Sequence, residues 1–291
     1  MREMTEESNR TLGIPTLNPH WIQSRILAGL MDKHHVEITI GDWLVTLSNE
    51  EKEEFWRKWE NSQNYVKSLQ ESPPSTAIVN ETDENLKALH EELKKREDIS
   101  RSFAGSVTSI GLVDLSNVVA IQPSVQGHPD NVSLDQEWLR AYCLPLPKAP
   151  PCDVNVSFSP PIGNALFISD VPYMNSVSVD SKDGRLTVSP GVHVNFLQVN
   201  EFQGRSYLIN GYHRAFSLLK AGVNIVPAWI VRGPPPQLLG AEFFNLGYLM
   251  NLKRQPFLSD FLTSASLDCR KRLRKYGIHL RLEIAPFNVP L

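Results

Sequence analysis

The chain has 291 residues, of which 41% are hydrophobic and 21% are charged, and its formal net charge at pH 7 is −3. This composition supports a packed core and excludes wholesale disorder, and its slightly acidic balance does not favour a protein that coats nucleic acid. The three cysteines are too few and too scattered for a disulfide framework or a zinc site, so we expect no metal site. The start is polar, without the apolar segment of a secretory signal, and no apolar run is long enough for a membrane helix. We therefore expect a cytoplasmic protein without a membrane partner.

The chain begins with patterns that favour short elements. Asn18–Leu30 predicts a helix, since Asn18 suits the cap, proline suits the first helical position and apolar residues form one stripe. Val36–Ile40 alternates apolar and polar residues, which predicts a short strand or an extended linker.

Two longer helices follow. Ser48 and Glu51 form a capping-box pattern, in which each side chain satisfies a backbone N–H of the other, and this predicts a helix that ends before Pro73-Pro74. Asp83–Ile99 predicts a second helix. Residues 1–103 are therefore expected to form a mostly helical N-terminal region.

The middle of the chain is rich in strand patterns. Ser106–Ile121 holds strand-like runs, Val132–Ala141 predicts a short helix, and Lys182-Asp183-Gly184 predicts a hairpin turn. Further strands are expected at 153–158, 166–168, 176–179, 185–188, 192–199 and 206–209.

The tail is mixed. Helices are expected at Gln237–Leu252 and within Ser259–Tyr276, and a last strand at 280–284. The sum is an α+β fold with a helical N-terminal region (1–103), a central α+β domain (104–233) and a mostly helical C-terminal extension (234–291).

The segment Tyr207–Val231 carries the most chemical information. Its pattern predicts a strand, a tight turn, a helix and a second strand, with Asn210, Gly211 and Tyr212 leading into the basic pair His213 and Arg214. The entrance of a helix exposes unpaired backbone N–H groups and the positive end of the helix dipole. Gly lets the backbone approach an anion, Arg can bind a phosphate through two donors, and His can donate a further hydrogen bond. The alternative is structural: Arg214 pairs with a local carboxylate and His213 caps the turn.

This motif resembles that of the ParB/sulfiredoxin-like superfamily, in which a Gly-x-His-Arg turn lies between a strand and a helix. Ala221-Gly222 and Val226-Pro227-Ala228 match the Gly and the strand that follow the helix in that family. The resemblance is clear over about Val192–Val231, and it implies a small mixed β-sheet core for residues 104–233. It also implies that Asn210, Gly211, Tyr212, His213 and Arg214 bind the phosphate of a nucleotide, with ATP and CTP as candidates and Mg²⁺ as the accompanying ion.

The chain also departs from the family. Tyr212 stands where sulfiredoxins need a cysteine, which argues against that activity. No Glu-Asn-x-x-Arg-like motif and no helix-turn-helix pattern follow Arg214, as they do in chromosome-partitioning members. Asp114 is placed loosely like the catalytic base of the free-serine kinases of this fold, but we favour its interpretation as a surface aspartate at a strand end.

Other candidates are weaker. Glu201 falls in a hairpin turn, His193 on a strand, and His34-His35 lack a third metal ligand. A cluster of cations could follow a phosphate backbone at helical spacing or form a solvated helix face: Arg270, Lys271, Arg272, Arg274, Lys275 and Arg281. Four aromatic residues could form a partner surface or pack in the core: Trp21, Phe55, Trp56 and Trp59.

Two hypotheses remain. In the first, the protein binds a nucleotide or another phosphorylated small molecule and acts as a phosphotransferase or a nucleotide hydrolase, with His213 and Arg214 as catalytic residues. In the second, it is a non-catalytic module that keeps the fold as a scaffold and binds DNA or a protein. The sequence leaves open whether the protein is an enzyme.

Overall fold

The computed structural model describes residues 21–71, 75–126, 132–145, 155–159, 164–169, 174–182, 185–192, 196–236, 244, 247, 249, 252, 254–272 and 276–281. The chain forms two compact units, each described here by itself. The larger unit consists of Trp21–Pro147 and Asn195–Arg272. The described strands of the smaller unit lie within Lys148–Val194 and Leu273–Leu291.

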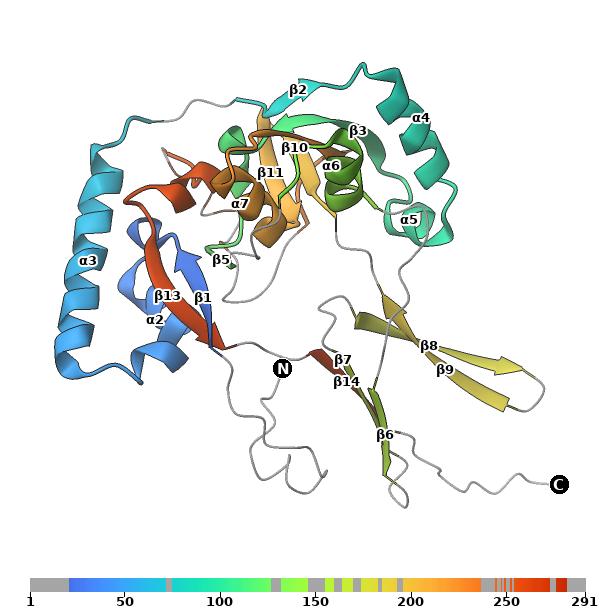
Figure 1. The fold of residues 1–291 in the computed structure, drawn as a ribbon, viewed down its shortest axis with the longest axis horizontal. Coiled ribbons are helices and arrows are strands. Elements are labelled where there is room, and N and C mark those ends of the chain that lie inside the picture. Colours follow the sequence, from blue (N-terminus) through green and yellow to red (C-terminus); the bar gives the residue numbers. More distant parts are fainter. Residues whose placement is uncertain are drawn as a thin grey trace. The chain divides into compact units, whose positions relative to one another are not determined.

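A mixed six-stranded sheet organises the larger unit, in the order β2-β3-β12-β10-β11-β4 (Figure 1). Its strands are β2 (Ile78–Asn80), β3 (Val107–Asp114), β4 (Val119–Ala120), β10 (Gln198–Phe202), β11 (Arg205–Asn210) and β12 (Ile225–Arg232). β10 pairs parallel with β12, and β11 pairs parallel with β4, whereas the other neighbours are antiparallel. The predicted strands at 106–121, 206–209 and 225–231 are confirmed.

The central strand β12 is buried on both faces. Its alternate residues Val226, Ala228 and Ile230 belong to one core cluster, and Trp229 and Val231 belong to another. Successive side chains of a strand point to opposite faces, so this division identifies two layers of packing on the sheet. Helix α7 (Tyr212–Lys220) contributes to the first cluster, and helices α4 (Glu84–Leu93) and α5 (Glu97–Ser102) contribute to the second.

A second, three-stranded sheet joins distant parts of the chain. Its order is β13-β1-β5, with β1 at Trp21–Ile26, β5 at Ser124–Gln126 and β13 at Leu267–Arg272. All its pairs are antiparallel, and Trp21 pairs with Arg272 at one end. Helix α3 (Asn49–Ser68) runs beside this sheet (Figure 1) and packs on the 3-10 helix η1 (Ala28–Leu30).

The remaining elements of the larger unit are short helices. They are α2 (Lys33–Leu44), α6 (Gln136–Cys143) and the 3-10 helices η2 (Leu115–Asn117) and η3 (Leu258–Leu262). Within the described ranges, none of the helices has the length and apolar composition that crossing a membrane requires.

The smaller unit contains five described strands. β6 (Asn155–Ser159), β7 (Asn164–Ser169) and β14 (Tyr276–Arg281) form an antiparallel sheet in the order β14-β7-β6. β8 (Met174–Lys182) and β9 (Arg185–Val192) form a hairpin in which Lys182 pairs with Arg185. The strands predicted at 166–168, 176–179 and 185–188 are confirmed, and the pairing of Lys182 with Arg185 agrees with the hairpin turn predicted at Lys182-Asp183-Gly184, of which Asp183 and Gly184 lie outside the described residues.

The α+β class is confirmed, and several helices are where the sequence predicts them. The capping box of Ser48 and Glu51 is formed and opens α3. The helical pattern of Asp83–Ile99 is divided between α4 and α5, and the helix predicted at Val132–Ala141 begins later, after the cap Asp135.

Three local predictions are wrong. The helix expected at Asn18–Leu30 is the strand β1 followed by η1, because β13 and β5 supply hydrogen bonds to both its edges. The short strand or extended linker expected at Val36–Ile40 lies inside α2, which Asp32 caps by accepting from the His35 N–H. Within the described part of Ser259–Tyr276, the structure has the short 3-10 helix η3 and the strand β13 in place of the expected α-helices. Most of Gln237–Leu252 lies outside the described residues.

The two units are defined by contacts in space, whereas the three regions predicted from the sequence are defined by changes in its pattern of helices and strands. The division into 1–103, 104–233 and 234–291 stays a prediction.

Candidate functional site

The predicted anion-binding turn has the predicted local structure. β11 ends at Asn210, Gly211 precedes α7, and β12 follows the helix. The Asn210 Oδ1 atom accepts a hydrogen bond from the Gly211 N–H at 2.8 Å, which shapes the turn. The strand, turn, helix and strand expected over Tyr207–Val231 are therefore all present.

Gly211 is required by the backbone and by its neighbours. Its φ of +85° lies in the left-handed region, where residues with a Cβ are strained. A Cβ at this position would lie 2.5 Å from Leu197 Cδ2 and 3.0 Å from the Phe196 carbonyl oxygen. The close packing of strand and helix thus explains the glycine without any ligand.

The side chains of Tyr212 and His213 differ in their burial. The Tyr212 side chain is buried, and its hydroxyl donates to the Leu208 carbonyl at 2.5 Å. Burial raises the pKa of this phenol, so it stays neutral. Only the backbone N–H of Tyr212 remains as a candidate ligand-binding group, whereas the His213 side chain is half-buried.

The His213 ring is fixed by a distant segment. Its Nδ1 atom accepts a hydrogen bond from the backbone N–H of Gln126 at 3.0 Å, at the end of β5. A nitrogen that accepts carries no proton, so the neutral ring has its N–H at Nε2. The Ser217 hydroxyl donates to the His213 carbonyl at 2.9 Å within α7.

Arg214 extends from the first turn of α7 to α6. Its Nη1 donates to the Tyr142 carbonyl at 2.8 Å, and its guanidinium carbon lies 5.3 Å from the centre of the Tyr142 ring. The Tyr142 ring also stacks with Trp138, with ring centres 4.5 Å apart and planes at 15°. The guanidinium is therefore held in place by a carbonyl and an aromatic ring.

The electrostatic environment of the turn is positive. The first turn of α7 contains His213 and Arg214 and no acidic residue. The N-terminal end of a helix carries a partial positive charge, so the backbone and the guanidinium act in the same direction. His213 and Arg214 therefore share the first turn of α7, while their side chains bond to different segments, His213 to Gln126 at the end of β5 and Arg214 to Tyr142 in α6.

The acidic candidates have structural partners. Asp114 caps η2 by accepting from the Ser116 N–H at 2.9 Å, and it also accepts from the Asn117 side chain at 2.8 Å. Glu201 lies 3.4 Å from the Arg232 guanidinium in an ion pair. Both contacts agree with the structural interpretations of these carboxylates.

Among the described histidine candidates outside the turn, His35 packs against an aromatic ring. The ring of His35 packs edge-on against Phe244, with ring centres 5.5 Å apart. In the part of the chain that the structure describes, no three His, Cys, Asp or Glu residues are grouped to hold a metal ion. His193 lies outside the described residues.

The basic cluster near 270 is not on a helix. Arg270 and Lys271 belong to β13, so their side chains alternate between the faces of a sheet. The Lys271 ammonium donates to the Ser124 hydroxyl at 2.9 Å. The prediction of a helical face that follows a phosphate backbone is therefore wrong; Arg274 and Lys275 lie outside the described residues.

The aromatic residues of α3 pack inward. Phe55 is buried, and Trp56 and Trp59 pack against the main core with their ring centres 5.6 Å apart. The Trp59 indole N–H donates to the Met31 carbonyl at 3.1 Å. This favours the core interpretation over the partner surface.

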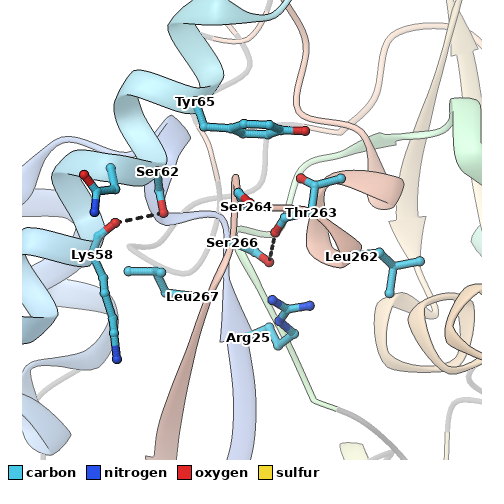
Figure 2. Close-up of a pocket in the computed structure, with 10 residues that line it drawn as sticks. Arg25, Lys58, Ser62, Tyr65, Leu262, Thr263, Ser264, Ser266 and Leu267 are labelled. Atoms are coloured by element: carbon cyan, nitrogen blue, oxygen red, sulfur yellow. Dashed lines mark hydrogen bonds between the residues drawn. The ribbon is translucent and has the colours of Figure 1, made fainter.

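The structure also contains a pocket that the sequence does not indicate. It has a volume of about 850 Å³ and lies between α3, β1 and the segment that joins η3 to β13 (Figure 2). Its residues come from three stretches of sequence, and none belongs to a motif. Only the pairing of β1 with β13 brings these stretches together.

Comparison with known proteins does not identify a family. No family model, no curated protein and no solved structure matches the chain.

Proposed function

We propose that the protein binds a phosphate-bearing ligand, with nucleotides as the main class, at the N-terminal end of α7. The observation that carries the proposal is the geometry of the turn. The helix begins at the left-handed Gly211, directly behind β11, and presents His213 and Arg214 in its first turn without a neighbouring carboxylate in that turn. Backbone N–H groups at such a helix end are suited to phosphate oxygens.

Each side chain has a distinct role in this proposal. Arg214 contributes positive charge and donors to the phosphate while its Nη1 stays bonded to Tyr142. His213 donates from Nε2, since Gln126 occupies Nδ1. Asn210 and Gly211 set the shape of the turn, and Tyr212 contributes its backbone N–H. Phosphoryl transfer or hydrolysis at this site would rely on the positioning of phosphates by these groups.

Calorimetric titration of the whole chain with ATP, with CTP and with inorganic phosphate, each with and without Mg²⁺, tests the proposal. We expect saturable binding of a nucleotide and a loss of about tenfold or more in affinity for Arg214→Gln. Lys220→Gln is the matched control, because it removes one positive charge from the other end of the same helix. The absence of any heat of binding in the native protein would reject the site, as would an Arg214→Gln variant that is folded by circular dichroism and binds normally.

A second candidate function rests on a different aspect of the same contacts. His213 and Arg214 each bond to the backbone of a remote segment, at Gln126 and Tyr142 respectively. This favours a turn that stabilises a scaffold, in which case the protein would be a non-catalytic module that binds DNA or a protein. Gel-shift titration over a range of salt concentrations separates this candidate from the first, because binding to a phosphate backbone weakens steeply with salt.

A further inference from the structure

The pocket beside α3 is separate from the turn at α7 and is framed by structured segments. Figure 2 shows Tyr65 reaching across its upper side and Arg25 rising from β1 below. α3 packs closely on η1, since a Cβ at Gly29 would lie 2.5 Å from the Ser62 carbonyl oxygen. Pockets of this size accommodate small organic ligands.

The opposite wall is also fixed. In η3, the buried Asp260 pairs with Arg254 at 2.5 Å and accepts from the Phe257 N–H at 2.8 Å. The chain then turns through hydrogen bonds from the Thr263 and Ser266 N–H groups to the Asp260 and Thr263 carbonyls. A ligand would therefore meet a preformed wall, which lowers the entropic cost of binding.

The pocket is cationic. Its lining includes Arg25 and Lys58 and no carboxylate. Lys58 is paired at 2.8 Å with Glu54 on the exposed face of α3, so Arg25 supplies most of the available charge. The Arg25 Nε atom lies 3.2 Å from Asp268, yet it is buried without an aligned hydrogen-bond partner, and Asp268 itself is 68% exposed.

The two Nη groups of Arg25 make no hydrogen bond to any described residue. Figure 2 shows the guanidinium directed toward Ser266 and Thr263. A guanidinium whose Nη groups bond no described residue, in a wide and open pocket, is suited to an oxyanion, and a phosphate or carboxylate matches its planar fork.

The hydroxyl groups of the pocket have the opposite hydrogen-bonding character. Ser62 donates its proton to the Lys58 carbonyl at 3.0 Å, Ser266 donates to the Phe261 carbonyl at 2.8 Å, and Thr263 donates to the Asp260 carbonyl at 3.0 Å. Each proton is committed to the backbone, so these oxygens can meet a ligand only as acceptors. Thr263 Oγ1 already accepts from the Ala265 N–H at 3.1 Å and keeps one lone pair, and Ser62 and Ser266 are each only 3% exposed. They suit a ligand that carries hydroxyl donors next to its anion.

An apolar surface completes the pocket. The Tyr65 ring lies above Ser264, and methyl groups come from Leu262 at the end of η3 and Leu267 at the start of β13 (Figure 2). Aromatic rings and methyl groups of this kind pack against the C–H face of a sugar ring or another compact ring.

From these three features we propose that the pocket binds a small sugar phosphate, with the phosphate at Arg25 and the sugar hydroxyls at the acceptors Ser62, Thr263 and Ser266. Inorganic phosphate provides only the anion and a neutral sugar provides only the hydroxyl donors. A compound that carries both uses the whole lining. The proposal does not rest on nucleotide binding at α7.

Thermal unfolding and calorimetry of the whole chain, with glucose 6-phosphate, glucose and inorganic phosphate as probes, test this site. A ligand that binds only the folded state raises the melting temperature. We expect glucose 6-phosphate to raise it most. We also expect Arg25→Gln to weaken glucose 6-phosphate binding about tenfold or more. Asp268→Asn should bind at least as tightly as the native protein, because it removes the carboxylate that competes for the guanidinium.

Matched variants separate the two sites. Arg214→Gln should leave glucose 6-phosphate binding at the native level, and loss of binding in that variant instead of Arg25→Gln would overturn this proposal and support the turn at α7. Equal effects of inorganic phosphate and glucose 6-phosphate would overturn the sugar component. If Arg25→Gln does not fold, Tyr65→Ala replaces it, because the Tyr65 side chain is half-buried and forms no hydrogen bond to described residues; unchanged affinity in that variant would equally overturn the proposal.

Discussion

Arg214 and Tyr142 are in contact through both a hydrogen bond and a ring. The Arg214 Nη1 atom lies 2.8 Å from the Tyr142 carbonyl oxygen, and its guanidinium carbon lies 5.3 Å from the Tyr142 ring centre. The two residues are 72 positions apart, so the contact ties the start of α7 to α6. Arg214 therefore contributes to the fold as well as to any anion site.

Arg214→Ala should lower the free energy of unfolding by about 1–3 kcal/mol, since a charged hydrogen bond and a cation–π contact are lost. Urea unfolding followed by circular dichroism measures this change. Lys220→Ala, an exposed position on the same helix, should change stability by less than about 0.5 kcal/mol. Equal stability of the Arg214→Ala variant and the native protein would show that the contact with Tyr142 contributes nothing.

Gly211→Ala should cost about 2–4 kcal/mol of stability, through the left-handed backbone and the contact with Leu197. Gly222→Ala is the matched control. It also has a positive φ, +81°, but a Cβ there meets nothing within 4 Å. It should cost only about 1 kcal/mol. Urea midpoints of the two variants compare them, and a Gly222→Ala variant at least as unstable as Gly211→Ala would contradict the packing argument.

Cys143 and Cys269 should resist thiol reagents in the native protein. Both side chains are buried, and burial raises the pKa of each thiol to about 12, so almost no thiolate is present at neutral pH. Brief treatment with iodoacetamide, followed by peptide mass spectrometry, should find both unmodified without urea and both modified in urea. Native labelling of Cys269 would contradict the placement of β13.

Stability should fall in mild acid because of His90. Its imidazole is buried beside Trp229, with ring centres 4.9 Å apart, and its Nε2 atom lies 2.9 Å from the Thr108 hydroxyl. Burial, with a smaller effect of the Lys94 ammonium, lowers the pKa of His90 below its ordinary value. The unfolded chain then binds the proton more readily, so the stabilising effect is complete above the ordinary pKa and is lost as pH falls below it.

The measurement is the free energy of urea unfolding from about pH 7.5 to about pH 5.5, a range that contains the ordinary histidine pKa. The native protein should lose more stability over this range than His90→Gln, which keeps a polar group near Thr108 without a titratable ring. Identical pH profiles of the two proteins would exclude a contribution of His90.

The sequence predicts elements well where the signal is local. The capping box of Ser48 and Glu51, the strand and helix around Gly211 and the hairpin after Lys182 depend on neighbouring residues, and all are present. Trp21–Ile26 has a helical pattern of apolar residues, yet it is a strand because its partners are almost 250 positions away in β13. Local periodicity carries no information about such partners.

The candidate sites also differ in whether they can be predicted from the sequence. The residues from Asn210 to Arg214 can be found from the sequence, because they are consecutive and follow a strand. Their contacts with Gln126 and Tyr142 cannot, since those bonds depend on the packing of β5 and α6 against α7. The pocket at Arg25 cannot be predicted from the sequence, because its walls come from β1, α3 and the segment after η3, which are distant in the chain.

The register of β1 and β13 has a mechanical consequence. The larger unit starts at Trp21 and ends at Arg272, and these two residues are direct partners at the same end of an antiparallel ladder. Tension applied to the chain on either side of this unit would break the residue pairs of this ladder one after another, beginning with Trp21 and Arg272. The shared boundary is therefore the point at which stretching would begin to open this unit, long before the six-stranded sheet bears any load.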